Sequence, residues 1–377
     1  MEENMKIAIV TSPFGELPPA ALGAVEKLFY LLAGEWVKAG CRVTFVCCGG
    51  GADARLDYVR LKKYKRTGST KKDLVWDLLY SAKALWKCPK ADILLCNTFW
   101  TPVLAPLFRW KYKKLIYGVH RYPKGQFWLY PCVHAFICVS TVVADELRRQ
   151  LGSGKRVFVI SNPIDTNIFH KCWVLSTQRQ TFTIVYAGRV HPEKGLDILF
   201  KAAQLLQNQI GDVRVVLKII GTTDVKKGGG GESYVKRLAQ LAPAVAVSWQ
   251  GEMTDAKMLA DYMRKGDCFV YPSIAQKGES FGVAPLEAMA LGLPTLLSNL
   301  KCFADYVEPG VNAIQINMEG NAAVNLKEAL RYVWEHSEKM NPLSDCAAKT
   351  ALRFSQEKIA KEYVDCFRRV LREGGCE

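Results

Sequence analysis

The sequence of 377 residues lacks several features that mark other classes of protein. No apolar run approaches the roughly 20 residues that a membrane-spanning helix needs. The first residues, Met1 to Lys6, are polar and acidic and do not have the layout of a signal peptide. The thirteen cysteines include no Cys-x-x-Cys spacing, so they indicate buried free thiols in a reducing compartment rather than a disulfide or zinc framework. We therefore expect a cytoplasmic protein.

Acidic residues are scarce relative to basic ones, and the imbalance is uneven. The formal net charge is +15. Residues 1–165 contain 25 Lys and Arg against 13 Asp and Glu, whereas the remainder contains 26 against 23. The first half is thus strongly basic and the second nearly neutral, so a negatively charged partner should approach the first half.

The basic excess is greatest in residues 55–90, with 11 Lys and Arg against 3 Asp and Glu, next to Trp76 and Trp86. A second basic cluster, residues 109–114, contains Trp110. Basic residues beside tryptophans are typical of contact with an anionic bilayer, so we expect peripheral attachment to the inner face of the membrane. A solvated basic face over an ordinary core helix remains an alternative. No recognisable nucleic-acid-binding motif accompanies the charge, so we expect no nucleic-acid partner.

Alternating strands and helices predict an α/β protein of about two domains. Short apolar runs and helical segments follow one another in both halves. In the first half we expect strands at 6–10, 42–47, 92–96, 115–119, 135–139 and 156–160, with a helix at 24–38. In the second we expect strands at 182–187, 213–220, 245–249, 268–271 and 294–298, with helices at 195–207 and 255–265. Two last helices, 322–338 and 355–371, close the chain.

The chain is organised around residues 278–294, a glycine-punctuated loop that leads into a short helix. Two carboxylates, Glu279 and Glu287, lie eight residues apart on it. Backbone N–H groups that lead into a helix N-terminus can bind phosphate, while a carboxylate can bind sugar hydroxyls. The stretch therefore predicts a nucleotide-sugar site, whose amides belong to Phe281, Gly282 and Val283.

Two cations precede this stretch in residues 188–195. Arg189 offers a planar fork and Lys194 a point charge, and both suit a diphosphate. The sequence contains no Asp-x-Asp, the motif with which metal-dependent transferases hold their ion. We therefore expect no metal and no cofactor besides a nucleotide donor. In the first half, His120 follows the strand 115–119, where parallel sheets bind ligands.

Residues 278–294 resemble the Glu-x7-Glu signature of retaining GT-B glycosyltransferases, most closely glycosyltransferase family 4. Residues 188–195 are similar to the Gly-Arg and Lys-Gly element of that family. The segment 162–165 looks like its Asn-Gly-Val-Asp turn with Pro163 in place of glycine. At the expected glycine-rich turn, Gly23 is present but Ala24 replaces the usual second glycine.

The resemblance implies a GT-B fold, in which two Rossmann-like domains face each other across a cleft. The expected domains are 1–168 for the acceptor, 169–354 for the nucleotide sugar, and a helix within 355–377 that crosses back to the first domain. The implied reaction moves a sugar from a nucleotide diphosphate sugar to an acceptor hydroxyl with retention. The implied partners are this donor and a glycan or lipid-linked acceptor, in cell-surface glycan or glycolipid synthesis.

The resemblance also assigns roles to residues. Glu279 would hold the sugar hydroxyls, Glu287 the ribose, and His120 the sugar or the acceptor. The implied catalytic residues are His120, Arg189, Lys194 and Glu279. The implied donor-binding residues are Gly23, Gly188, Gly221, Gln250, Phe281, Gly282, Val283 and Glu287.

Two alternatives remain open. A nucleotide-sugar 2-epimerase of the same fold would need no acceptor. A non-enzymatic basic protein would bind membranes or polyanions without binding a sugar nucleotide.

Overall fold

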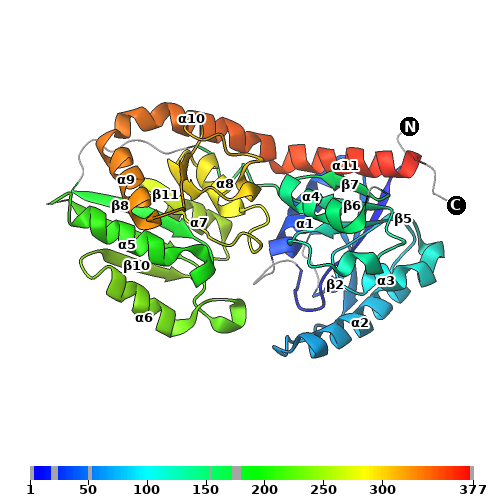
Figure 1. The fold of residues 1–377 in the computed structure, drawn as a ribbon. Helices are drawn as coiled ribbons and strands as arrows, with labels where there is room; N and C mark the ends of the chain where they lie inside the picture. The colour runs from blue at the N-terminus through cyan, green and yellow to red at the C-terminus, as the bar shows by residue number, and fades with distance from the viewer. Residues whose placement is uncertain are drawn as a thin grey trace. The chain divides into compact units, whose positions relative to one another are not determined.

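The computed structural model describes residues 4–17, 24–49, 53–152, 154–171, 180–211 and 213–373. The chain divides into two compact units, Met1–Pro163 with Ser355–Glu377 (unit 1) and Ile164–Phe354 (unit 2) (Figure 1). The division falls between Pro163 and Ile164, whereas the sequence places it after residue 168. Unit 2 is therefore an insertion between the main part of unit 1 and its last helix.

Unit 1 is built on a seven-stranded sheet of order β3-β2-β1-β4-β5-β6-β7, and all its neighbouring strands are parallel. Its inner strands are nearly continuous apolar runs because helices cover both faces of such a sheet. The register pairs Ile7 with Val43 on one side of β1 and with Ile93 on the other. The strands are β1 (Lys6–Val10), β2 (Arg42–Cys48), β3 (Asp57–Leu61), β4 (Ala91–Cys96), β5 (Tyr112–Val119), β6 (Ala135–Cys138) and β7 (Arg156–Val159).

Helices connect most of these strands, because parallel neighbours need a crossover connection rather than a tight hairpin. Ser140 caps α4 by accepting a hydrogen bond from the backbone N of Val143. The α-helices are α1 (Ala24–Lys38), α2 (Thr70–Lys87), α3 (Thr101–Leu104), α4 (Thr141–Leu151) and α11 (Gln356–Arg372). Two short 3₁₀ helices are η1 (Ala105–Lys111) and η2 (Gln126–Leu129).

Unit 2 contains a second parallel sheet, of order β10-β9-β8-β11-β12-β13. Its strands are β8 (Thr181–Ala187), β9 (Arg214–Ile220), β10 (Ala246–Gly251), β11 (Cys268–Tyr271), β12 (Thr295–Ser298) and β13 (Ile314–Ile316). Its α-helices are α5 (Leu196–Gln207), α6 (Gly231–Leu241), α7 (Ala256–Met263), α8 (Val283–Ala290), α9 (Ala322–Glu335) and α10 (Met340–Ala351). Its 3₁₀ helices are η3 (Pro192–Lys194), η4 (Val225–Lys227), η5 (Lys301–Phe303), η6 (Ser337–Lys339) and η7 (Leu352–Phe354).

The predicted α/β class with two Rossmann-like domains is confirmed. The prediction of only two closing helices is wrong, because α10 lies between them. Asn341 and Pro342 make its start look like a break, yet proline is tolerated in a first helical turn, where its missing N–H has no partner. The edge strand β3 was also missed, because it is short, carries the charged residues Asp57 and Arg60, and fully buries only Leu61.

The described cysteines are free thiols, and all but Cys132 and Cys346 are buried. Burial raises the pKa of Cys47 to about 12 and that of Cys48 to about 11, so both are protonated and unreactive at neutral pH. In the described ranges, no helix combines the length and the apolar character needed to cross a membrane.

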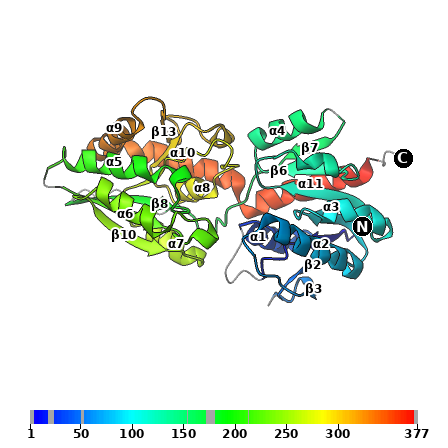
Figure 2. The same ribbon diagram turned by 60° about the horizontal axis from the view of Figure 1, so that its bottom comes forward.

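The last helix, α11, belongs to unit 1 and lies beside α1 (Figure 2). Trp36 of α1 is fully buried between Tyr363 and Phe367 of α11, with both ring centroids 5.5 Å from its own. Its indole N–H donates a hydrogen bond of 3.2 Å to the carbonyl of Ala360. A tryptophan with a satisfied N–H joins the two ends of the chain in one core.

Replacing Trp36 by alanine should therefore destabilise the protein by about 3–5 kcal/mol, because it leaves a large cavity between α1 and α11. The measurement is urea unfolding followed by circular dichroism. The matched control is Trp86→Ala, since 71% of Trp86 is exposed and surface substitutions usually change stability by about 0.5 kcal/mol or less. Equal losses in the two variants would contradict this account of the core.

Candidate active site in unit 2

The strand order of unit 2 defines where its ligand site lies. From β8 the chain moves outward through β9 to β10, then returns to β11 on the other side of β8. Open parallel sheets bind ligands at the carboxyl ends of the strands where the direction reverses. In unit 2 this point lies between β8 and β11, and the segments that follow these strands carry Arg189, Lys194 and Glu279.

Two glycines shape the backbone at this edge. Gly188 follows β8 and Gly221 follows β9, and a Cβ on Gly221 would lie 1.8 Å from the carbonyl oxygen of Gly188. Gly221 has φ +147°, a conformation that side chains rarely adopt. Only glycine fits at position 221, so these residues have a structural reason to be there besides any contact with a donor.

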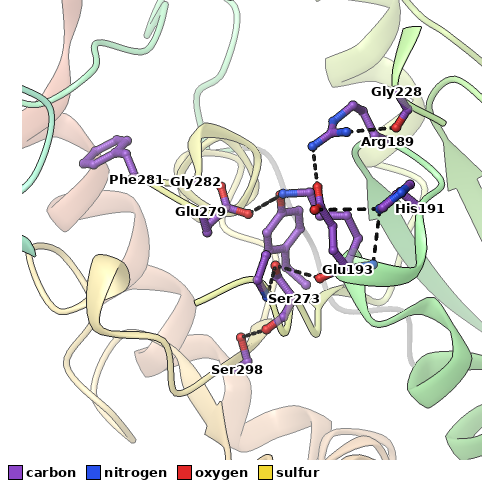
Figure 3. A network of polar contacts seen from close by, with 12 residues as sticks. Arg189, His191, Glu193, Gly228, Ser273, Glu279, Phe281, Gly282 and Ser298 are labelled. Atoms are coloured by element: carbon purple, nitrogen blue, oxygen red, sulfur yellow. Dashed lines mark hydrogen bonds and ion pairs between the residues drawn. The ribbon is translucent and has the colours of Figure 1, made fainter. Parts of the chain in front are cut away.

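Lys194 and Glu279 form a buried ion pair (Figure 3). Lys194 Nζ lies 2.6 Å from Glu279 Oε2, and the two side chains are only 7% and 10% exposed. The turn after Lys194 contacts the end of β11, where a Cβ on Gly195 would lie 2.0 Å from the carbonyl oxygen of Pro272. This close contact brings the loop after β8 against the loop after β11. The structure thus unites two residues that are 85 positions apart in the sequence.

Tyr271, the last residue of β11, completes this pair. Its hydroxyl donates a hydrogen bond of 2.9 Å to Glu279 Oε2, and Lys194 Nζ lies 5.6 Å from the centre of its ring. Burial, followed by the negative charge of Glu279, raises the pKa of Tyr271 well above its ordinary value, so the hydroxyl remains a donor. Both bonds end on Oε2. Among the described residues, Glu279 Oε1 has no hydrogen bond.

Arg189 lies at the edge of the same network of polar contacts. Its guanidinium contacts Glu193 Oε1 at 2.5 Å and donates a hydrogen bond of 2.8 Å to the carbonyl of Gly228 (Figure 3). The side chain is 41% exposed. Arg189 is therefore accessible to an anion, whereas Lys194 is enclosed.

The predicted amides lie at the start of α8. Gly282 is its N-cap with φ +79°, and no side chain caps the first turn. Tyr306 fixes this turn because its hydroxyl donates to the carbonyls of Phe281 and Gly282, at 3.2 and 2.9 Å. The ring of Phe281 is buried against Tyr306 and points away from the polar network (Figure 3). A ligand at this turn would therefore meet only backbone groups of Phe281 and Gly282, together with the backbone group of Val283.

The remaining predicted residues are more dispersed. Glu287 lies half-buried within α8. Gln250 is exposed on the edge strand β10 and donates to Ser248 Oγ at 2.8 Å, outside the network of Figure 3. His120 belongs to unit 1, packs against the ring of Phe29, and has a pKa that burial lowers to about 4. Its imidazole is therefore neutral at pH 7. Gly23 lies outside the described residues.

Sequence reasoning missed Tyr271 and Glu193, the direct partners of Glu279 and Arg189. Two patterns in the sequence could have pointed to them. Tyr271 is the last residue of a strand, and Glu193 lies four residues after Arg189. Both patterns are common in structural positions, so neither would single out a site by itself.

A surface cavity of about 390 Å³ lies in unit 1, lined among others by Lys6, Arg42, Asp57 and Lys90. These residues start or precede β1, β2, β3 and β4, at the amino ends of the strands. Ligands of such sheets bind at the opposite edge. We therefore assign this cavity no part in the chemistry.

Gly221→Ala should disrupt the candidate site. The new Cβ would meet the backbone of Gly188, so we expect a loss of about 1–3 kcal/mol in unfolding free energy beyond backbone strain. Gly310→Ala is the matched control, because Gly310 also has positive φ (+76°) but has nothing within 4 Å of the added Cβ. Urea unfolding of both variants measures the difference. A Gly221 variant no less stable than the Gly310 variant would refute the close contact.

Comparisons with known proteins agree with this architecture. Sucrose-phosphate synthase from Thermosynechococcus elongatus superposes with a TM-score of 0.76 at 17% identity, covering 98% of this chain and all of that chain. Anabaena HepE, solved with UDP and glucose, superposes with a TM-score of 0.72 at 18% identity, covering 97% of this chain and all of that chain. Two parallel-sheet domains of this kind define the GT-B class of glycosyltransferase folds.

Family models refine this assignment. Residues 25–168 match the model described as Glycosyltransferase Family 4, and residues 173–350 match Glycosyl transferases group 1. The chain belongs to glycosyltransferase family 4. A D-inositol 3-phosphate glycosyltransferase of Paenarthrobacter aurescens is 25% identical over 232 residues, which span 60% of this chain and 55% of that relative. The match thus spans about half the length of this curated relative.

Proposed function

We propose that the protein transfers a sugar from a nucleotide diphosphate sugar to an acceptor hydroxyl, with retention at the anomeric carbon and without a metal ion. The observation that carries the proposal is the buried Lys194–Glu279 pair at the switch point between β8 and β11. Family membership and the solved relative with UDP and glucose support it. The curated relative from Paenarthrobacter aurescens is named a glycosyltransferase, which favours transfer over the epimerase and the non-enzymatic alternative.

The donor would be held by charge and by backbone dipoles. Arg189 is exposed enough to pair with the outer phosphate oxygens, in exchange for part of its contact with Glu193. The uncapped first turn of α8 offers N–H groups and a positive helix dipole to the diphosphate. Glu279 would accept hydrogen bonds from sugar hydroxyls through Oε1, while Lys194 and Tyr271 hold Oε2 in place. Glu287 remains a proposed ribose ligand.

The rate would come from stabilising the departing diphosphate. Negative charge grows on its oxygens as the glycosidic bond breaks, and fixed cations in an enclosed site stabilise that charge without reorganising. Lys194 is such a cation, being almost fully buried. We assign no protein nucleophile, because Glu279 is already engaged by Lys194 and Tyr271. Retention would then follow from attack on the face from which the diphosphate leaves.

We propose a glycan or lipid-linked hydroxyl as acceptor, in cell-surface glycan or glycolipid synthesis. The positive charge of the first half of the chain supports an acceptor that carries negative charge. His120, neutral at pH 7, could accept a hydrogen bond from a hydroxyl of the sugar or of the acceptor.

Lys194→Ala and Arg189→Ala should each lower kcat by about 10²–10³, the loss seen when one group that stabilises developing charge is removed. The assay is release of nucleoside diphosphate from whichever of UDP-, GDP- and ADP-glucose raises the melting temperature most. Lys277→Ala is the control, because Lys277 is exposed two residues before Glu279 and has no place in the mechanism.

Lys194→Ala leaves Glu279 buried without its cation, which can itself destabilise unit 2. Arg189→Ala, at a partly exposed position, separates loss of catalysis from loss of folding. Near-normal turnover in both variants would eliminate this mechanism.

Metal removal gives a separate test. Because Arg189, Lys194 and the α8 amides supply the positive charge, turnover should change less than twofold in excess EDTA, and added Mg²⁺ should not raise it. Activity that disappears with EDTA and returns with Mg²⁺ would show that a metal ion, not these groups, stabilises the leaving diphosphate.

A further inference from the structure

Apolar side chains gather on one outer part of unit 1. Among the described residues, fifteen large apolar side chains are clearly exposed, and six of them lie between residues 75 and 110. They are Val75 (54%), Trp76 (36%), Leu79 (50%), Trp86 (71%), Leu107 (67%) and Trp110 (63%). Single exposed apolar residues are ordinary, but a group of them on neighbouring elements marks an interaction surface.

The group forms one face of α2, extended by η1. Lys72, Trp76, Leu79, Lys83 and Trp86 recur at three- and four-residue spacing, so they share one side of the helix. The buried residues Asp77, Tyr80, Ser81, Ala84 and Leu85 occupy the opposite side. At the end of α2, Lys111 of η1 donates hydrogen bonds to the carbonyls of Trp86 and Cys88, which places η1 beside it. We call the exposed side chains Lys72, Val75, Trp76, Leu79, Lys83 and Trp86 of α2, together with Leu107 and Trp110 of η1, the α2 face.

The charge of the α2 face is positive. Its lysines, Lys72 and Lys83, are exposed, as are Lys71 and Lys87 beside them. The two acidic residues of α2 accept hydrogen bonds from other segments of unit 1. Asp77 is buried and accepts a hydrogen bond of 2.9 Å from the backbone N of Trp100, and Asp73 accepts from the backbone N and the hydroxyl of Thr67. The outward side of α2 therefore has lysines and apolar groups without a competing carboxylate.

We propose that the α2 face docks unit 1 on the surface of an anionic lipid bilayer. Tryptophan favours the headgroup level, where its ring is apolar and its N–H is hydrated. Leu79, Val75 and Leu107 can enter the acyl boundary, while lysines between them reach the lipid phosphates. The proposal goes beyond the proposed function, because it states where the enzyme works and requires nothing of the donor site.

A nucleic acid fits this face less well. Proteins that bind single strands offer a basic groove with aromatic rings for stacking. The α2 face is the convex side of a helix, and three of its apolar groups are aliphatic, so they cannot stack on bases. Trp76 is moreover already stacked on Tyr64, with ring centroids 4.9 Å apart.

The test is co-sedimentation of the full chain with vesicles of phosphatidylcholine alone or with phosphatidylglycerol at three parts in ten. We expect binding to the anionic vesicles only, weakened by 0.5 M NaCl because salt screens exposed charge. Lys72→Glu with Lys83→Glu, and separately Leu79→Ser with Trp86→Ser and Trp110→Ser, should each lower the partition coefficient at least tenfold. Unchanged melting temperatures check that these exposed substitutions leave the fold intact.

Matched controls lie in unit 2. Lys236→Glu with Lys257→Glu makes the same change of charge at exposed positions, and Leu205→Ser with Met258→Ser removes exposed apolar groups. Both controls should bind vesicles as the natural sequence does. No binding by the natural sequence, equal binding to the two kinds of vesicle, or equal loss in the controls would overturn the proposal. Tight binding of single-stranded DNA without vesicle binding would overturn it in favour of a nucleic acid.

Lipids brominated along their acyl chains locate the contact directly, because they quench tryptophans that reach the hydrocarbon. Quenching should fall strongly when Trp86 and Trp110, the two most exposed tryptophans of the α2 face, are both replaced by phenylalanine. It should persist in Trp128→Phe, which alters an equally exposed tryptophan on η2. The reverse pattern would place the contact elsewhere. Donor binding, measured without vesicles, stays independent of all these results, so failure here is distinguishable from failure of the proposed function.

Discussion

The buried pairing of Lys194 with Glu279 is the constraint on which the candidate site depends. Two charges that are largely withdrawn from water are stable only if each satisfies the other and nearby donors complete their hydrogen bonds. Tyr271 provides such a donor, and the contact of Gly195 with Pro272 brings the two loops together. The pair thereby fixes Oε2 of the carboxylate, whereas Oε1 has no hydrogen bond to a described residue. Geometry that stabilises the protein without ligand is the same geometry that would orient a sugar.

Much of this architecture could be predicted from the sequence, since strands that are apolar throughout are easily recognised. The limits of β1, α1 and β11 agree with the prediction, and the Gly-Arg and Lys-Gly element does lie directly after β8. Arg189 and Lys194 were singled out because two cations suit a diphosphate, and both lie in the segment that follows β8. Elements with mixed signals were missed. The edge strand β3 has little to bury, and α10 begins with residues that usually end helices.

The contacts themselves were beyond prediction. Nothing in the sequence says that Glu279 meets Lys194, because that contact depends on β8 and β11 being neighbours although two strands separate them along the chain. Likewise the ring of Phe281 packs into the core, so the stretch that looked most ligand-like contributes its backbone rather than its largest side chain. The motifs drew attention to these residues, whereas the contacts between them follow from the order of the strands in the sheet.

The return of α11 to unit 1 has a consequence for how the chain is made. Trp36 is enclosed by Tyr363 and Phe367, which are synthesised only after the whole of unit 2. While unit 2 is being synthesised, the indole of Trp36 therefore lacks its partners from α11. Unit 2 is continuous in sequence and can fold during this interval. Unit 1 therefore begins before unit 2 and is completed after it, once α11 has been synthesised.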